Sequence, residues 1–103
     1  MAEAAKVSLV TVIAAFELNS EQGLEKELRA LGMKGYSLGK VNGWGIHGET
    51  HAGLVDSANV RIEAVVPTSV ADKVLDLVAK KGEESPIVAF AHDVKAVPRD
   101  RFR

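Results

Sequence analysis

Two histidines flank a short polar stretch in the middle of the chain, His47-Gly-Glu-Thr-His51. Two imidazoles and one carboxylate this close in sequence can gather around a metal ion. The spacing of the histidines suits a helix, but glycines at 43, 45, 48 and 53 disfavour one. We therefore expect a polar loop without a metal site, in which His47 is available to a small anion. Metal binding by His47 and His51 is the alternative.

His92-Asp93 is a second pair of neighbouring residues whose side chains could take part in catalysis. We interpret it as a hydrogen-bonded structural pair rather than a catalytic dyad, because no nucleophile accompanies it. The sequence contains neither a phosphate-binding P-loop nor a serine nucleophile elbow. We therefore expect a protein that is not an enzyme. A small enzyme using His92-Asp93 or the loop histidines stays open as an alternative.

The chain ends in a basic stretch, 98–103, that contains Arg99 and Arg101. Two residues that are two positions apart at the end of a strand lie on one side of it. Guanidinium groups bind phosphate oxygens through paired, charge-assisted hydrogen bonds. We therefore predict that Arg99 and Arg101 contact phosphate.

Length, charge and composition limit the classes of function. The 103 residues suffice for a single domain, 1–103. A formal net charge of −1 argues against nucleic acid as a partner. The absence of cysteine fits a reducing compartment, and we expect a cytoplasmic protein. The apolar run 7–16 is too short to cross a membrane, so we expect no membrane insertion.

The hydrophobic pattern predicts four strands and two helices. Runs rich in β-branched residues, or alternating apolar and polar residues, predict the strands. Apolar residues at helical spacing, with Asn19 or Ser20 capping the first helix and Thr68 or Ser69 the second, predict the helices. The expected elements are a strand over 7–16, one helix up to Gly32, strands over 36–41 and 58–66, a helix up to Gly82, and a strand over 87–91 that extends toward Val97.

This order is βαββαβ, which predicts an α+β, ferredoxin-like fold. Its four-stranded antiparallel sheet carries two helices on one face. Between the second and third strands, residues 43–57 lack periodicity and contain four glycines. A loop of that length in a compact domain is usually functional. We predict a flexible loop at 43–57 and a basic tail at 98–103.

Three short motifs within this pattern resemble those of a known protein family. They are Val41-Asn-Gly-Trp-Gly45, where the long loop begins; Asn59–Val66, in which a basic residue, Ile and Glu follow in order; and Phe90–Arg101, a strand leading into two arginines. Each resembles a motif of the PII signalling proteins, and the three occur in that family's order and spacing over nearly the whole chain. The chain therefore resembles a divergent PII-like signalling protein.

The resemblance implies a homotrimer with an adenine nucleotide in each cleft between neighbouring subunits. Ser37 and the Val65 backbone would lie near the adenine. Arg99 and Arg101 would reach phosphate from the neighbouring chain. The remaining implied nucleotide contacts are Lys40, Gly43, Trp44, Gly45, His47, and the backbone amides of the turn from Gly82 to Ser85. For Trp44 a hydrophobic clamp at the base of the loop is the alternative role, and for Lys40 a solvated strand position. For Arg61 and Glu63 we expect cross-strand or intersubunit pairing.

Departures from the family pattern bear on which nucleotide binds. Ile46 stands where PII proteins have an arginine, and Val88 where they have a phosphate-binding lysine. Glu83 and Glu84 replace a glycine-rich turn. These changes remove or oppose contacts to the outer phosphates, so AMP or ADP should bind at least as well as ATP. The loop has no tyrosine, which excludes uridylylation of such a side chain there.

Among PII-like proteins, the chain resembles most those associated with carboxysomes and bicarbonate uptake. This implies a link to inorganic carbon metabolism and a bicarbonate site beside the nucleotide. His47, Lys40 or Arg99 would supply a donor to that anion. The loop would serve as the readout and would contact an unknown protein partner. A trimeric metal-binding protein of the same fold, similar to CutA, is the alternative, although its aromatic signature and cysteine are missing.

Overall fold

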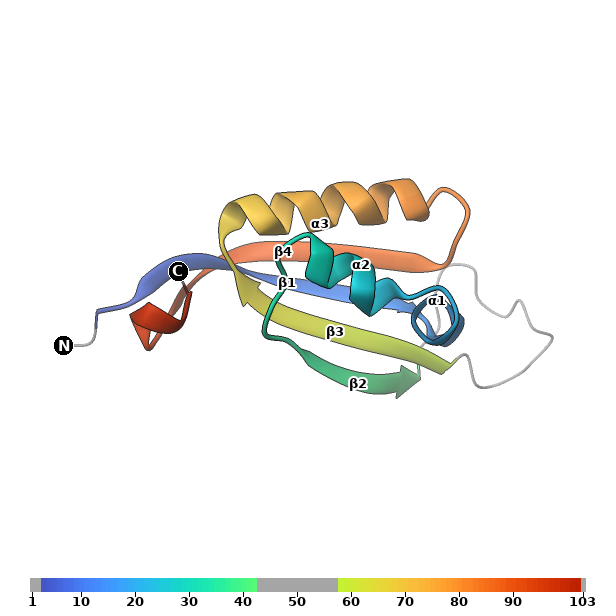
Figure 1. Cartoon of the computed structure of the whole chain (residues 1–103), viewed down its shortest axis with the longest axis horizontal. Coiled ribbons are helices and arrows are strands. Elements are labelled where there is room, and N and C mark those ends of the chain that lie inside the picture. The colour runs from blue at the N-terminus through green and yellow to red at the C-terminus, as the bar shows by residue number, and fades with distance from the viewer. Residues whose placement is uncertain (1–2, 43–57, 103) are drawn as a thin grey trace.

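The structure is a computed structural model that describes residues 3–42 and 58–102. Four strands form one antiparallel sheet in the order β2-β3-β1-β4. The strands are β1 (Ala5–Ala15), β2 (Ser37–Asn42), β3 (Ala58–Val66) and β4 (Ile87–Ala96). This arrangement confirms the predicted ferredoxin-like topology (Figure 1). The segment 43–57, predicted as a loop, lies outside the described residues.

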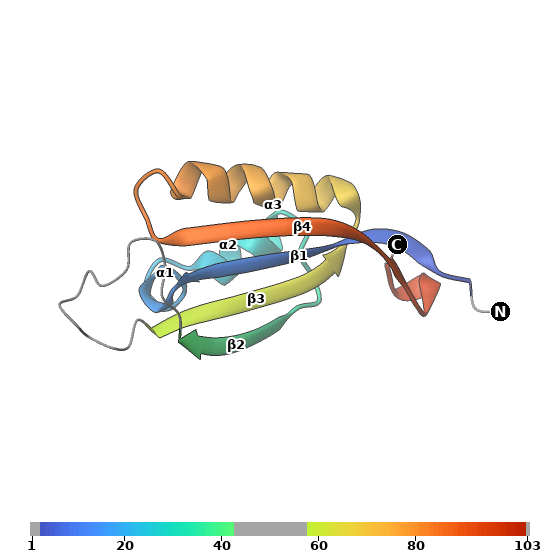
Figure 2. The same cartoon turned by 180° about the vertical axis from the view of Figure 1, so that it is seen from behind.

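The helices α1 (Phe16–Ser20), α2 (Leu24–Ala30) and α3 (Thr68–Lys81) cover one face of the sheet. No described helix covers the other face (Figure 2). A short 3₁₀ helix, η1 (Arg99–Phe102), follows β4. None of the described helices is long and apolar enough to span a bilayer.

The core lies between the sheet and the helices. Strand β3 supplies alternate residues to it, and the predicted pattern of Val60, Ile62, Ala64 and Val66 is confirmed, since all four are buried. The central strand β1 is largely buried on both faces, as its run of apolar and β-branched residues predicts. Strand β4 continues to Ala96, which confirms the extension beyond residue 91.

The prediction of one helix before Gly32 was wrong, because Gly23 divides that region into α1 and α2. Gly23 has a φ of 72°, a left-handed conformation that glycine adopts readily and that interrupts a helix. The N-cap residue of α2 is Gly23, which has no side-chain cap, so neither Asn19 nor Ser20 is the N-cap residue as predicted, although Asn19 does contact the first turn of α2. Its side-chain oxygen accepts a hydrogen bond from the backbone N–H of Glu25 at 3.0 Å.

The second helix also begins differently from the expectation. Neither Thr68 nor Ser69 caps α3; its N-cap residue is Pro67, and no side-chain cap is formed. The Thr68 hydroxyl instead lies 3.0 Å from the hydroxyl of Ser8 on β1. A hydroxyl at the sheet is thereby satisfied, and the start of α3 is tied to the central strand.

A polar network joins α1, α2 and the chain entering β2. The Tyr36 hydroxyl donates to Glu25 Oε1 at 2.6 Å and accepts from Arg29 Nη1 at 2.6 Å. The amide of Asn19 donates to the other Glu25 oxygen at 2.6 Å. The hydrogen bonds from Tyr36 and Asn19 hold the pKa of Glu25 below its ordinary value. The Glu25 carboxylate in turn raises the pKa of Tyr36.

We predict that Glu25→Gln lowers the free energy of unfolding at pH 7 by about 1 kcal/mol, since it weakens charge-assisted hydrogen bonds. The lowered pKa means that the folded state favours the ionised carboxylate. This stabilisation is present above the unfolded-state pKa and is lost as pH falls through the lower folded-state value. Denaturant unfolding should therefore show a difference from wild type at pH 7 that shrinks at about pH 3.

Glu27→Gln is the matched control on the same helix. Glu27 pairs with Lys81 of α3 at 2.8 Å, at the surface. Such exposed ion pairs contribute about 0–1 kcal/mol, so this variant should change stability less. Equal losses from the two substitutions, or a Glu25→Gln difference that does not vary with pH, would contradict the role given to the network.

Candidate functional site

A hollow of about 690 Å³ opens where β2 begins and β3 ends. Three residues predicted from the sequence to contact the ligand line it together: Ser37, Val65 and Arg101. They come from β2, β3 and η1, which are far apart in sequence. A cavity of this size can hold a small organic ligand. The structure thus brings these three predicted residues to one place.

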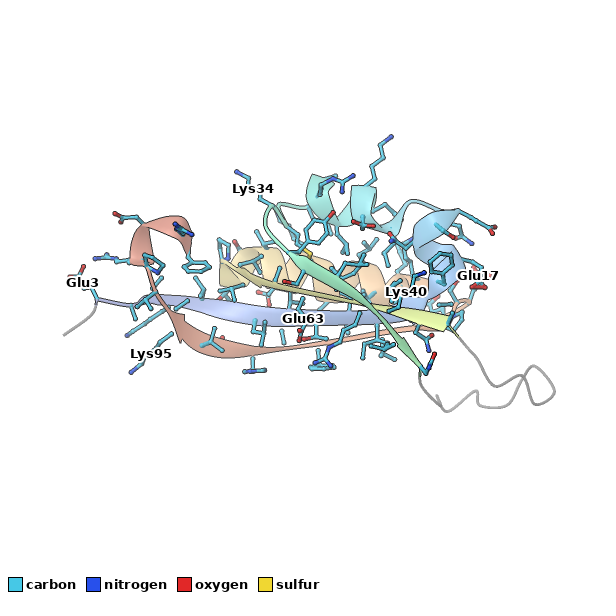
Figure 3. The ribbon with its side chains drawn as sticks, turned by 90° about the horizontal axis from the view of Figure 1, so that it is seen from below. Glu3, Glu17, Lys34, Lys40, Glu63 and Lys95 are labelled. Atoms are coloured by element: carbon cyan, nitrogen blue, oxygen red, sulfur yellow. The ribbon has the colours of Figure 1, made fainter. Side chains whose placement is uncertain are left out.

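Two of these residues are placed by the sheet register. Ser37 is opposite Glu63, and Val65 is opposite Leu9 of β1. Successive residues of a strand alternate between faces, so Ser37, Glu63 and Val65 share the face that the helices leave open. Figure 3 shows Glu63 on that side of the sheet.

Glu63 is the best-anchored carboxylate of the hollow. Its Oε2 accepts hydrogen bonds from Thr11 Oγ1 at 3.2 Å and from Arg61 Nη2 at 3.0 Å. The expectation of cross-strand pairing is confirmed for Glu63, whose partner Thr11 lies opposite it on β1. Arg61 instead pairs with Glu63 along β3 itself.

Arg99 and Arg101 do not lie on one side of a strand, as the sequence analysis assumed. Both belong to η1, and in a 3₁₀ helix residues two apart point in widely different directions. Arg101 lines the hollow described above. Arg99 instead lines a smaller neighbouring hollow and pairs with Glu3 at 2.7 Å.

The turn from Gly82 to Ser85 lacks the free amides that phosphate binding was expected to use. The backbone N–H groups of these four residues all donate to carbonyls of α3, at 2.8 to 3.3 Å. The turn therefore sits at the carbonyl end of a helix, where the dipole disfavours anions. Glu83 and Glu84 are exposed there and add negative charge. In this conformation the turn opposes phosphate.

Lys40 also has a different environment from the one expected. It pairs with Val60 in the sheet, which places it on the helix-bearing face. Its ammonium lies 5.3 Å from the centre of the Phe16 ring at the start of α1 (Figure 3). This distance is within the range of a cation–π interaction. Lys40 thus ties the edge strand to α1.

The predicted contact residues fall at two ends of the sheet. The turn that contains Ser85 lies at one end, beside Ala15 of β1, whose N–H donates a hydrogen bond to the Pro86 carbonyl at 3.0 Å. The hollow lies near Leu9, six residues back along β1, which is roughly 20 Å at about 3.3 Å per residue. Glu17 and Lys95 mark these two ends in Figure 3.

The other chemical candidates are not assembled in the described part of the chain. His92 and Asp93 lie on opposite faces of β4, so the expected hydrogen-bonded pair is not formed, and Asp93 accepts from Ser8 at 3.2 Å. No group of three or more potential metal ligands occurs among residues 3–42 and 58–102. Outside the described residues lie Gly43, Trp44, Gly45, His47 and His51.

The lining residues that sequence reasoning did not assign to the site include Lys34, Tyr36 and Phe102. Gly32 lines it as well, with a φ of 113° and a built Cβ only 3.1 Å from Val70. Lys34 and Tyr36 flank Gly35 directly before Ser37, and Phe102 directly follows Arg101. The sequence could have indicated these residues only through their position next to the predicted contacts Ser37 and Arg101.

Comparison with known proteins supports the fold. Structures similar over the full length include CPII from Thiomonas intermedia K12 bound to ADP and bicarbonate, with 25% identity, TM-score 0.80, and 100% of each chain covered. A PII-like signalling protein from Thermus thermophilus has 25% identity and TM-score 0.76, with 98% of this chain and 99% of that one covered.

A more distant structure, the ATP complex of GlnK from B. subtilis, shares only the fold, with 20% identity, TM-score 0.57, and 90% and 85% of the chains covered. No curated protein sequence matches the chain significantly. Residues 7–101 match the family described as nitrogen regulatory protein P-II. The chain belongs to the nitrogen regulatory protein P-II family.

Proposed function

We propose that the chain is a signalling protein that binds AMP or ADP between neighbouring copies and reports occupancy through the segment 43–57. The observation that carries the proposal is the hollow that Ser37, Val65 and Arg101 line together. The similar protein CPII, which was crystallised with ADP, AMP and bicarbonate, supports the same class of ligand. We extend the proposal to a role in inorganic carbon metabolism and to a protein partner for the segment 43–57.

The separation of the two groups of contacts supports a site shared by two copies. Residues at both ends of one sheet contact a single nucleotide most simply when a second copy supplies one of the ends. Repeating such a head-to-tail contact closes into a ring when the rotation allows it. A cyclic trimer is the ring we propose.

The uncovered face of the sheet supplies a reason for assembly. Its apolar side chains include Val88 and Phe90, which are 54% and 48% exposed. Leu9, Ile13 and Val65 lie beside them in the register. Exposed apolar patches of this kind commonly mark interaction sites, so three such faces can cover one another.

We predict that the protein is a homotrimer at micromolar concentration and that Phe90→Glu converts it to monomers, because a carboxylate would be buried without a partner. Multi-angle light scattering measures both. Leu38→Glu is the control, since Leu38 is similarly exposed, at 42%, but lies on the helix-bearing face. The proposed assembly would be contradicted if the wild type were monomeric, or if the two substitutions changed the oligomeric state equally.

We predict that AMP or ADP binds at least as tightly as ATP. The turn that would hold the outer phosphates has its amides engaged and carries Glu83 and Glu84. Each missing charge-assisted hydrogen bond can weaken binding by roughly 1.5–3 kcal/mol. Isothermal titration calorimetry of the three nucleotides tests this, and the prediction fails if ATP binds tenfold more tightly than ADP.

We predict that bicarbonate strengthens ADP binding by about fivefold or more, the lower range of allosteric coupling. Lys40 already contacts Phe16, and we assign Arg99 to phosphate, which leaves His47 and the glycines at 43, 45 and 48 as the proposed bicarbonate contacts. The measurement is calorimetry with ADP, with bicarbonate or chloride at matched pH and ionic strength. By reciprocity, ADP must strengthen bicarbonate binding equally. Unchanged ADP affinity would refute the coupling.

A further inference from the structure

Phe102 is an aromatic residue of the hollow to which the proposed function assigns no role. It is the last residue of η1 and is half-buried, whereas Arg99 and Arg101 in the same helix are exposed. It lines the large hollow and the smaller one beside it. Phe102 therefore borders both hollows.

The short helix that carries Phe102 is fastened to the sheet. Arg99 pairs with Glu3, just before β1, at 2.7 Å. The N–H of Arg101 donates to the carbonyl of Pro98 at 3.1 Å, which closes the turn. These contacts hold the end of the described chain against the hollow, so the position of Phe102 is set before any ligand arrives.

The polar groups of the hollow can form hydrogen bonds with the edge of a planar base. They provide no contact for the flat face of its ring. Ser37 offers a hydroxyl, Glu63 a carboxylate and Val65 backbone groups. The face of a heteroaromatic ring requires instead a flat apolar surface. Of the two aromatic side chains that line the described hollow, Tyr36 packs against the core and is held by Glu25 and Arg29. Phe102 belongs to no such cluster.

We propose that Phe102 is a base-stacking residue, against which the adenine of the bound nucleotide lies while Arg101 reaches its phosphate. The assignment rests on the proposed nucleotide site and adds the residue that recognises the ring face. Stacking depends on the base alone, so its contribution is the same for every number of phosphates. An arginine contact, in contrast, grows in importance as phosphates are added.

The test is calorimetry of adenosine, AMP and ADP with wild type, Phe102→Leu and Phe102→Tyr. Leucine keeps apolar bulk and loses the ring, so all three affinities should fall by about tenfold, a common effect of removing a stacking partner. Tyrosine keeps the ring and should retain wild-type affinity. Lys73→Ala, at an exposed position in the middle of α3 that lines neither hollow, is the control and should leave the affinities unchanged.

Distinct outcomes separate this inference from the proposed function. If wild type binds none of the three ligands, the nucleotide site itself fails. If wild type binds and Phe102→Leu binds equally well, only the stacking role is overturned. A loss that increases from adenosine to ADP would also overturn it, since Phe102 would then act by positioning Arg101.

An NMR measurement on unaltered protein guards against a Phe102→Leu chain that does not fold. Stacking places the two carbon-bound protons of the adenine ring close to a phenylalanine ring, so nuclear Overhauser effects should connect them. The signal should be absent in Phe102→Tyr protein labelled only at phenylalanine, which assigns it to residue 102. Its persistence in that variant would rule out Phe102 as the stacking partner.

Discussion

The position of every functional element depends on strand β1, which is hydrogen-bonded along both edges. It pairs with β3 from Ser8 to Ala15 and with β4 from Ala5 to Ala14. Both neighbouring strands are hydrogen-bonded to β1 in a defined register. The distance between the hollow and the turn after α3 is therefore set by the number of β1 residues that lie between them. A shift by one residue would exchange the buried and open faces of a neighbouring strand. The two ends of the proposed site are therefore rigidly related, although no single copy brings them together.

The chemistry at these two ends is unequal. The turn after α3 uses its amides to close the helix and exposes Glu83 and Glu84, so it contributes no attraction for phosphate. The opposite end contributes Arg101 and Lys34 beside the polar groups of the hollow. Under the proposed function, most of the favourable contact with a nucleotide would therefore come from the base, the sugar and the first phosphates. The residues at the turn and at Val88 would both favour nucleotides with shorter phosphate chains.

Sequence patterns predicted the order of the strands and the buried face of β3 because alternation directly records which side chains avoid water. They missed the break at Gly23, where one residue with positive φ overrides a regular spacing of leucines. They also misplaced Arg99 and Arg101, since nothing local distinguishes a strand end from the 3₁₀ helix that follows it. The amides from Gly82 to Ser85 could not be assigned from sequence, because whether a turn closes a helix depends on the geometry of its last carbonyls. Ser37 and Val65, which the family resemblance assigned to the ligand, line the same hollow because the register of β2, β3 and β1 brings them to one end of the sheet; their contact with a nucleotide stays a prediction.

The ion pair between Arg99 and Glu3 shows how the site can be both ordered and open to a ligand. It fastens η1 to the start of β1, but Arg99 and Glu3 have side chains 50% and 80% exposed. An ion pair this exposed contributes about 0–1 kcal/mol, whereas a hydrogen bond to a charged group is worth about 1.5–3 kcal/mol. Under the proposed function, phosphate can therefore replace Glu3 as the partner of Arg99 with little loss of free energy. Arg101 and Phe102 would then change their position only slightly, because the turn from Pro98 to Arg101 is closed by its own backbone hydrogen bond.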